Sequence, residues 1–148
     1  MPNLRRRVNE EQGFTLIELL VVVLVIGILA AIVIPAFLNQ TGKAQDASAK
    51  ELTHTAQVAA ETYATDHNGS YASLTPASLQ SEEASIVIAS GTSNAYVVSA
   101  TGTATGYAIT VAPARPSETF TVTRAGGTVT RTCTPSSGAH GGCLNGTW

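Results

Sequence analysis

The stretch Gly13-Phe14-Thr15-Leu16-Ile17-Glu18 opens an apolar run that continues from Leu19 to Ile34. Between Phe14 and Leu38 only Thr15 and Glu18 are clearly polar. At about 1.5 Å of rise per residue, a helix of these 25 residues spans roughly 37 Å, enough to cross a bilayer core of about 30 Å. The sequence therefore predicts a membrane-spanning helix over residues 14–38, around which the rest of the chain is arranged.

Glu18 is the single carboxylate in this apolar helix. An acidic side chain at the centre of a membrane helix costs about 2.5–3.5 kcal/mol on insertion scales, and less near the helix end. Such a residue marks a functional site, at which the carboxylate meets a partner.

Positive charge precedes the apolar run at Arg5 to Arg7. The positive-inside bias keeps that end in the cytoplasm, so everything after Leu38 lies on the far side of the membrane. Disulfides form on that side, and the only two cysteines, Cys133 and Cys143, both lie there. We expect them to form a disulfide; the alternative is a zinc or other metal site.

The apolar run has a second interpretation, a secretory signal peptide cut off near Ala30-Ala31 or Ala36. Two observations argue against it. The run exceeds the apolar region of about 7–15 residues that is usual in a signal peptide. A membrane-buried Glu18 also has no purpose in a discarded segment, so we expect the helix to be retained.

The composition excludes a strongly basic surface over the whole molecule. Charged residues make up 12% of the 148 residues, and the formal net charge is −2. Without the first 13 residues, five Lys and Arg face eight Asp and Glu, an excess of three acids. The length leaves room for one small domain beside the helix.

The segment from Met1 to about Gln40 resembles the precursor of a type IV pilin or of a closely related pseudopilin. The resemblance rests on the short basic leader, the Gly-Phe junction, the Thr-Leu-Ile-Glu motif, and the apolar helix with Gly27 and Pro35. It implies cleavage between Gly13 and Phe14 by a membrane-embedded prepilin peptidase. The same enzyme is expected to methylate the amine freed on Phe14, which leaves its positive charge in place.

The resemblance also implies how copies assemble. In a filament, Glu18 would neutralise the amine of Phe14 of a neighbouring copy and so fix the register between helices. The alternative is a pair within one chain, because Phe14 and Glu18 are one helical turn apart. Pro35 predicts a kink. The segment between Gly27 and Pro35 would loosen on packing, although both residue types are also simply common in membrane helices.

The outer half of the helix is expected over residues 39–67. Its predicted apolar stripe is Ala44, Ala47, Leu52, Ala56, Ala59 and Tyr63, and its predicted polar face is Lys43, Asp46, Lys50, Glu51 and Glu61. Asp46 and Lys50 are spaced to form an i,i+4 ion pair. Asn68-Gly69 predicts the helix end.

The remaining residues, 68–148, predict an extracytoplasmic antiparallel head. Thr75-Pro76 favours a short helix through Leu79. The predicted strands are 85–89, 95–100, 106–112, 118–124 and 128–132, four or five in total. The fold class is therefore α+β, a type IV pilin-like ladle whose long helix packs on a small sheet. Residues 1–13 are its cleaved leader, and the Cys133–Cys143 loop closes its C-terminal end.

Nothing in the sequence predicts an enzyme, a cofactor or a metal site. The three histidines, His54, His67 and His140, have no ligand spacing, and no nucleophile or phosphate-binding motif is present. Asp66, Glu82 and Glu83 lack the surrounding pattern of a calcium loop. The few aromatic residues are expected to serve packing and not DNA stacking; they include Phe37, Tyr63, Tyr71, Phe120 and Trp148.

Three functions are open. The first is a pilus subunit that polymerises with itself into an extracellular filament for adhesion, surface motility or DNA uptake, with possible contact to DNA or a host surface. The second is a pseudopilin of a type II secretion or competence apparatus. The third is an anchored or secreted binding domain that never polymerises. By resemblance, a motor ATPase and a platform protein would drive assembly from the cytoplasmic membrane.

Overall fold

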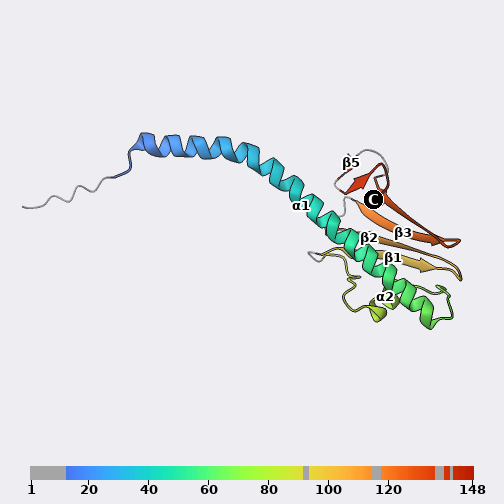
Figure 1. Ribbon diagram of the computed structural model, residues 1–148. Helices are drawn as coiled ribbons and strands as arrows, with labels where there is room; N and C mark the ends of the chain where they lie inside the picture. Colours follow the sequence, from blue (N-terminus) through green and yellow to red (C-terminus); the bar gives the residue numbers. More distant parts are fainter. Residues whose placement is uncertain (1–12, 92–93, 115–117, 136–138, 141) are drawn as a thin grey trace, which may run out of the picture. The chain divides into compact units, whose positions relative to one another are not determined.

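The structure is a computed structural model that describes residues 13–91, 94–114, 118–135, 139–140 and 142–148 (Figure 1). The side chains of residues 39, 139 and 140 are not described. The predicted basic leader over residues 1–12, with Arg5 to Arg7, therefore lies outside the described residues.

The chain forms two compact units, of which the second, Leu38–Trp148, is here called the head. The first unit ends at Phe37. One helix, α1 (Leu16–Asp66), contributes to both units. The other elements are α2 (Pro76–Glu82), β1 (Tyr96–Gly102), β2 (Tyr107–Ala112), β3 (Thr119–Ala125), β4 (Thr128–Thr134), β5 (Ala139–His140) and β6 (Cys143–Leu144). This order and content confirm the predicted α+β class.

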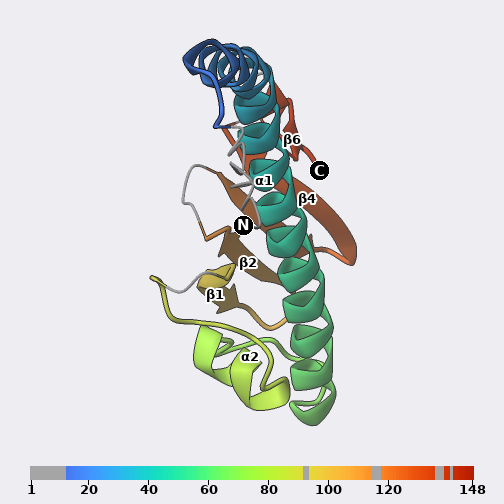
Figure 2. The same cartoon turned by 90° about the vertical axis from the view of Figure 1, so that its left-hand side faces the viewer.

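The head is built on an antiparallel sheet in the order β1-β2-β3-β4. Short turns join β1 to β2 and β3 to β4, as the turn residues in the sequence predicted. The outer half of α1 lies across one face of the sheet, with α2 beside its end (Figure 2). Buried side chains alternate along β2 and β3, because one sheet face packs on α1 and the other is open. Tyr107, Ile109, Phe120 and Val122 are among the core residues.

The face by which α1 packs differs from the predicted stripe. Ala44 and Ala47 are exposed. The buried positions are Asp46, Ala49, Thr53, Ala56, Ala59, Ala60, Tyr63 and Ala64. Alanine occurs on several sides of α1, so hydrophobic periodicity alone does not identify the side that faces the sheet. Small residues at the contact allow the helix to pack closely on the sheet, and Asp46, predicted on the polar face, is 5% exposed.

The ends of the helices follow the predicted local chemistry. Asn68 and Gly69 adopt φ of 54° and 81°, the left-handed conformation that ends a helix, and the Gly69 N–H donates to Ala64 O. Thr75 caps α2: its Oγ1 accepts from the Ser78 N–H, and its own N–H donates to Ser78 Oγ. The helix continues to Glu82, beyond the predicted end at Leu79.

The strand predicted over 85–89 is absent: these described residues form no ladder. The Ile86 carbonyl accepts from the Gln80 side chain, and the Val87 carbonyl accepts from the Val97 N–H. Isolated hydrogen bonds of this kind give buried backbone carbonyl groups a partner without adding a strand to the sheet. Ile86 is fully buried, so the apolar content of the segment reflects core packing.

Gly102 allows the chain between the two helices to lie against β1. A Cβ at this position would lie 1.9 Å from the Tyr71 carbonyl oxygen and 2.9 Å from Leu74 Cβ. Tyr71 and Leu74 are core residues, so neither is free to withdraw. Glycine is therefore required here by close approach.

Gly102→Ala should lower the free energy of unfolding by about 2–3 kcal/mol, because the added methyl overpacks a backbone contact. Chemical unfolding of the detergent-solubilised chain, followed by Trp148 fluorescence, measures the effect. Gly42→Ala is the matched control, since a Cβ there meets nothing within 4 Å inside α1. That substitution should stabilise by up to about 1 kcal/mol. Equal stabilities for the two variants would contradict the close approach.

Candidate assembly site

The apolar side chains of the first unit are exposed to the surroundings. Phe14 is 82% exposed, and the large apolar side chains from Leu16 to Leu38 are between 48% and 81% exposed. Within the described residues, α1 is, by length and composition, long and apolar enough to cross a membrane. Such a surface requires lipid or other protein to cover it.

Glu18 forms a reciprocal cap with Thr15 at the start of α1. Thr15 Oγ1 accepts from the Glu18 N–H at 3.2 Å, and Glu18 Oε2 accepts from the Thr15 N–H at 3.2 Å and from Thr15 Oγ1 at 3.0 Å. This is the capping box, in which a threonine and a glutamate three positions later accept hydrogen bonds from backbone N–H groups that have no carbonyl partner at the start of a helix. The sequence analysis missed it, although the pattern Thr15-x-x-Glu18 carries the signal.

The capping box leaves the predicted partner of Glu18 undecided. In the described chain Gly13 and Phe14 are still joined, so Phe14 offers a peptide N–H and not an amine. Neither the pair between copies nor the pair within one chain is tested, and both stay predictions. Cleavage would leave the capping residue Thr15 second in the chain, next to a new positive charge.

The two predicted interruptions of the apolar segment lie inside α1. The helix includes Pro35 between Leu16 and Asp66. A Cβ on Gly27 would meet nothing within 4 Å, so this glycine is not required by packing within the chain. The predicted kink at Pro35 and the loosening between Gly27 and Pro35 stay predictions.

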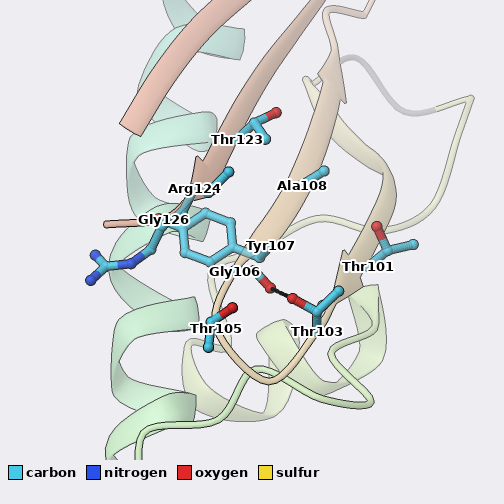
Figure 3. Close-up of a pocket in the computed structure, with 11 residues that line it drawn as sticks. Thr101, Thr103, Thr105, Gly106, Tyr107, Ala108, Thr123, Arg124 and Gly126 are labelled. Carbon is cyan, nitrogen blue, oxygen red and sulfur yellow. Dashed lines mark hydrogen bonds between the residues drawn. The ribbon is translucent and has the colours of Figure 1, made fainter. Parts of the chain in front are cut away.

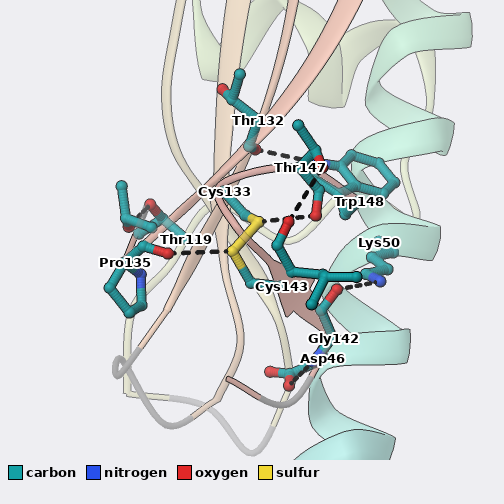
Figure 4. The surroundings of a disulfide bond; sticks show 12 residues. Asp46, Lys50, Thr119, Thr132, Cys133, Pro135, Gly142, Cys143, Thr147 and Trp148 are labelled. Carbon is teal, nitrogen blue, oxygen red and sulfur yellow. Dashed lines mark hydrogen bonds between the residues drawn. A yellow bond between two sulfur atoms is a disulfide. The ribbon is translucent and has the colours of Figure 1, made fainter. Parts of the chain in front are cut away.

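The disulfide joins Cys133 on β4 to Cys143 on β6, as the sequence predicted. Asp46 and Lys50 of α1 hold the peptide groups of the adjacent Gly142 (Figure 4). The Gly142 N–H donates to Asp46 Oδ2 at 2.9 Å, and Lys50 Nζ donates to the Gly142 carbonyl at 2.6 Å. The C-terminal segment is therefore tied to α1, and we call this contact the clasp.

The clasp corrects the predicted ion pair between Asp46 and Lys50. Both side chains bind Gly142 instead, and the ion pair within the described part of the chain is Arg124–Glu61. Lys50 Nζ also lies 5.8 Å from the ring centre of Trp148, whose indole N–H donates to the Thr132 carbonyl. A partner about ninety residues away cannot be found from local spacing.

Glu61 joins α1 to the sheet at the start of β2 and the end of β3, away from the clasp. Its Oε1 accepts from Arg124 Nη1 at 2.9 Å and from the Tyr107 hydroxyl at 3.2 Å, and its Oε2 accepts from the Tyr71 hydroxyl at 2.6 Å. Burial, the hydrogen bond to Glu61 and its negative charge raise the pKa of Tyr71. Burial, followed by the charge of Glu61, raises the pKa of Tyr107 more strongly. The sequence analysis had placed Glu61 on the polar face.

An open hollow of about 330 Å³ lies beside this cluster, at the turns that join β1 to β2 and β3 to β4 (Figure 3). Thr101, Thr103 and Thr123 are among its lining residues. Thr103 Oγ1 donates to the Gly106 carbonyl, so part of its polar lining is already satisfied. The arrangement contains no catalytic pairing among the described residues.

His67 and several aromatic residues contact other rings within the head, whereas His54 and Phe37 are exposed. The His67 ring stacks on Tyr63, with 3.9 Å between ring centres, and Phe120 and Trp148 meet edge to face. Within the described residues, no three His, Cys, Asp or Glu side chains form a cluster that could hold a metal ion. The side chain of His140 lies outside the described residues.

Replacing both cysteines by serine should lower the free energy of unfolding by about 2–3 kcal/mol, since the ten-residue separation closes a short loop. The same loss should release the clasp, because Gly142 precedes Cys143 directly. Amide hydrogen exchange at Gly142 measures that release, and unfolding of the solubilised chain measures stability. Unchanged protection at Gly142 would contradict the coupling.

Raising the pH above about 10 should destabilise the wild-type chain more than Tyr107→Phe. A tyrosine in the unfolded chain ionises near pH 10, whereas Tyr107 in the folded chain keeps its proton to higher pH. The free energy of unfolding therefore falls as pH rises through this window. Urea unfolding on both sides of pH 10 tests it, with Tyr96→Phe as control; parallel pH profiles for all three chains would refute it.

Comparison with known proteins finds similarities that include the N-terminal motif. A model described as "Prokaryotic N-terminal methylation motif" matches residues 9–34. A fimbrial protein of Pseudomonas aeruginosa is 37% identical over 87 residues, 56% of each chain. The "Type IV major pilin protein PilE1" of Neisseria gonorrhoeae is 37% identical over 76 residues, 51% of this chain and 35% of its own.

Other matches are shorter. The "Type IV major alpha-pilin" of Moraxella bovis is 54% identical over 37 residues, 25% of this chain and 23% of its own. The chain thus covers between about a quarter and just over half of the length of these relatives. No solved structure matches. The N-terminal part of the chain, with its methylation motif and long apolar helix, is therefore similar to the corresponding part of type IV pilins and fimbrial proteins.

Proposed function

We propose that this chain is a structural subunit of a type IV pilus. The precursor enters the cytoplasmic membrane with its N-terminus inside, is cut after Gly13, and polymerises through residues 14–38 into a surface filament. The exposed apolar helix carries this proposal, because its large side chains have no covering within the described chain. Lipid covers them before assembly, and the helices of other copies cover them afterwards.

Glu18 gives this assembly its register. The capping box with Thr15 satisfies the carboxylate in the uncut chain through hydrogen bonds alone, without a positive charge. Cleavage creates a positive amine on Phe14, which methylation keeps charged. An amine and a carboxylate are each costly in a low-dielectric filament core, and pairing them between copies offsets part of both costs.

The partners of the chain follow from this cycle. A prepilin peptidase cuts after Gly13 and methylates Phe14, and a platform protein with a motor ATPase moves subunits from the membrane into the filament. Pilus and fimbrial relatives favour a pilus over a pseudopilus. Adhesion, motility and DNA uptake are the uses open to the filament, with the head as its outer surface.

Glu18→Gln should permit cleavage after Gly13 and reduce sheared filaments at least about tenfold, because an unpaired buried charge costs about 3–5 kcal/mol. Glutamine keeps an acceptor for the Thr15 cap and removes only the charge. Thr15→Ala is the matched control: it removes the cap, worth about 1 kcal/mol, and keeps the charge, so filaments should persist.

The measurement combines electron microscopy of sheared filaments with mass spectrometry of the N-terminus, in cells that carry the assembly machinery. Abundant filaments from Glu18→Gln would refute the pairing between copies. Mature protein that begins downstream of Ala30 would refute the retained helix, and with it the proposed function.

A further inference from the structure

Two neighbouring hollows follow one side of α1 in the head and share Thr55. One, of about 340 Å³, lies between α1 and the segment before β1, and the other, of about 200 Å³, lies between α1 and the end of α2. Their lining residues on α1 include Ser48, Glu51, Thr55, Val58 and Thr62, with Glu82 and Glu83 contributed from the end of α2. We call the two hollows together the groove.

The groove has an apolar centre and acidic ends. Val58 is 53% exposed, one of three exposed large apolar side chains of the described head beyond Leu38. Glu51 lies at one end, and Glu82 and Glu83 lie at the other. The Ser85 N–H donates to Glu83 Oε1, and this hydrogen bond lowers the pKa of Glu83. Among the described residues none of these three carboxylates forms an ion pair.

A surface of opposite character lies beside the clasp. Lys43 is exposed and stands on the same side of α1 as Asp46 and Lys50, three and seven positions later. Those two residues hold Gly142, and Leu144, two residues further, is 60% exposed. We call Lys43 and Leu144 the corner; it offers a cation and an apolar side chain.

The corner and the groove are different surfaces of one chain. At about 100° per residue, the side of α1 that carries Lys43 and Lys50 is roughly 80° from the side that carries Glu51 and Val58. Contact between two unlike surfaces is heterologous, and repeated without closure it generates an open helical filament. A contact between identical surfaces would stop at a dimer.

We propose that the groove receives the corner of a second copy of this chain. Gly142 is held between positions 46 and 50, level with position 48. A parallel copy displaced by ten residues, roughly 15 Å along α1, brings its Gly142–Leu144 segment level with Val58 of the first copy. The same displacement brings its Lys43 level with position 53, within a turn of Glu51. One displacement therefore satisfies the apolar and the charged contact.

This inference rests on the proposed function, because it names the surfaces by which heads meet in the filament. Charge complementarity selects the second copy: the groove is acidic, and Lys43 is exposed with no hydrogen bond or ion pair among the described residues. Lys50, Arg124 and Arg131 each bind within their own head. A cationic site on another protein is the competing occupant, which the test distinguishes.

A charge-reversal cycle in the full chain tests the contact. Lys43→Glu and Glu51→Lys should each reduce sheared filaments at least about tenfold, since each places like charges together. The double variant should restore the yield to within about twofold of wild type. Residues 43 and 51 lie about 12 Å apart along α1, so restoration must arise between copies. Asp66→Lys, an exposed reversal outside the groove, should polymerise normally.

The apolar contact is tested by Val58→Glu, which should abolish filaments, and by Val58→Ile, which should keep them. Processing after Gly13 and formation of the Cys133–Cys143 disulfide report that each variant is inserted and folded. Normal filaments from Lys43→Glu or Val58→Glu would overturn the proposal, and so would a double variant no better than the singles. If the wild-type chain itself formed no filaments, the proposed function would be overturned, and the contact between heads would fall with it.

Discussion

The constraint on which this molecule depends is an apolar helix without a covering of its own. A soluble domain buries such side chains against a second layer, and here the head provides that layer only for the outer half of α1. There Ala49, Ala56 and Ala60 pack fully buried, whereas no large apolar side chain between Leu16 and Leu38 is less than 48% exposed. The uncovered surface therefore requires lipid or other protein, and under the proposed function the same residues would serve insertion first and assembly later.

The head meets a different requirement, which is to hold a small sheet firmly on one helix. Alanines on the helix allow close approach but bury little area, so polar contacts at both ends supplement the core. Glu61 binds Arg124 and two tyrosines at one end, and the clasp binds Gly142 at the other. The disulfide then keeps the C-terminal segment beside the clasp.

The features of this fold that depend on neighbouring residues could be predicted from the sequence. The contacts between residues far apart in the chain could not. The apolar run, the helix end at Asn68-Gly69, the Thr75 cap and the disulfide are each encoded by neighbouring residues or by compartment. The roles of Asp46, Lys50 and Glu61 depend on partners that, apart from Tyr71, lie 46 to 96 positions away, and no periodicity reveals them. Residues 85–89 were misassigned because burial in a core without a ladder produces the same apolar composition as a strand.

The capping box refines the interpretation of Glu18. A carboxylate with hydrogen-bond donors in its own chain is less costly in the membrane than an isolated one. Under the proposed function, the precursor would therefore tolerate the acid before it meets a neighbouring copy. Hydrogen bonds do not remove its charge, however, and only a cation does so. Under the proposed function, the cap satisfies the hydrogen bonds of Glu18 in the precursor, and the amine of a neighbouring copy would balance its charge in the filament. That combination explains why a threonine three positions before the acid belongs to the same site.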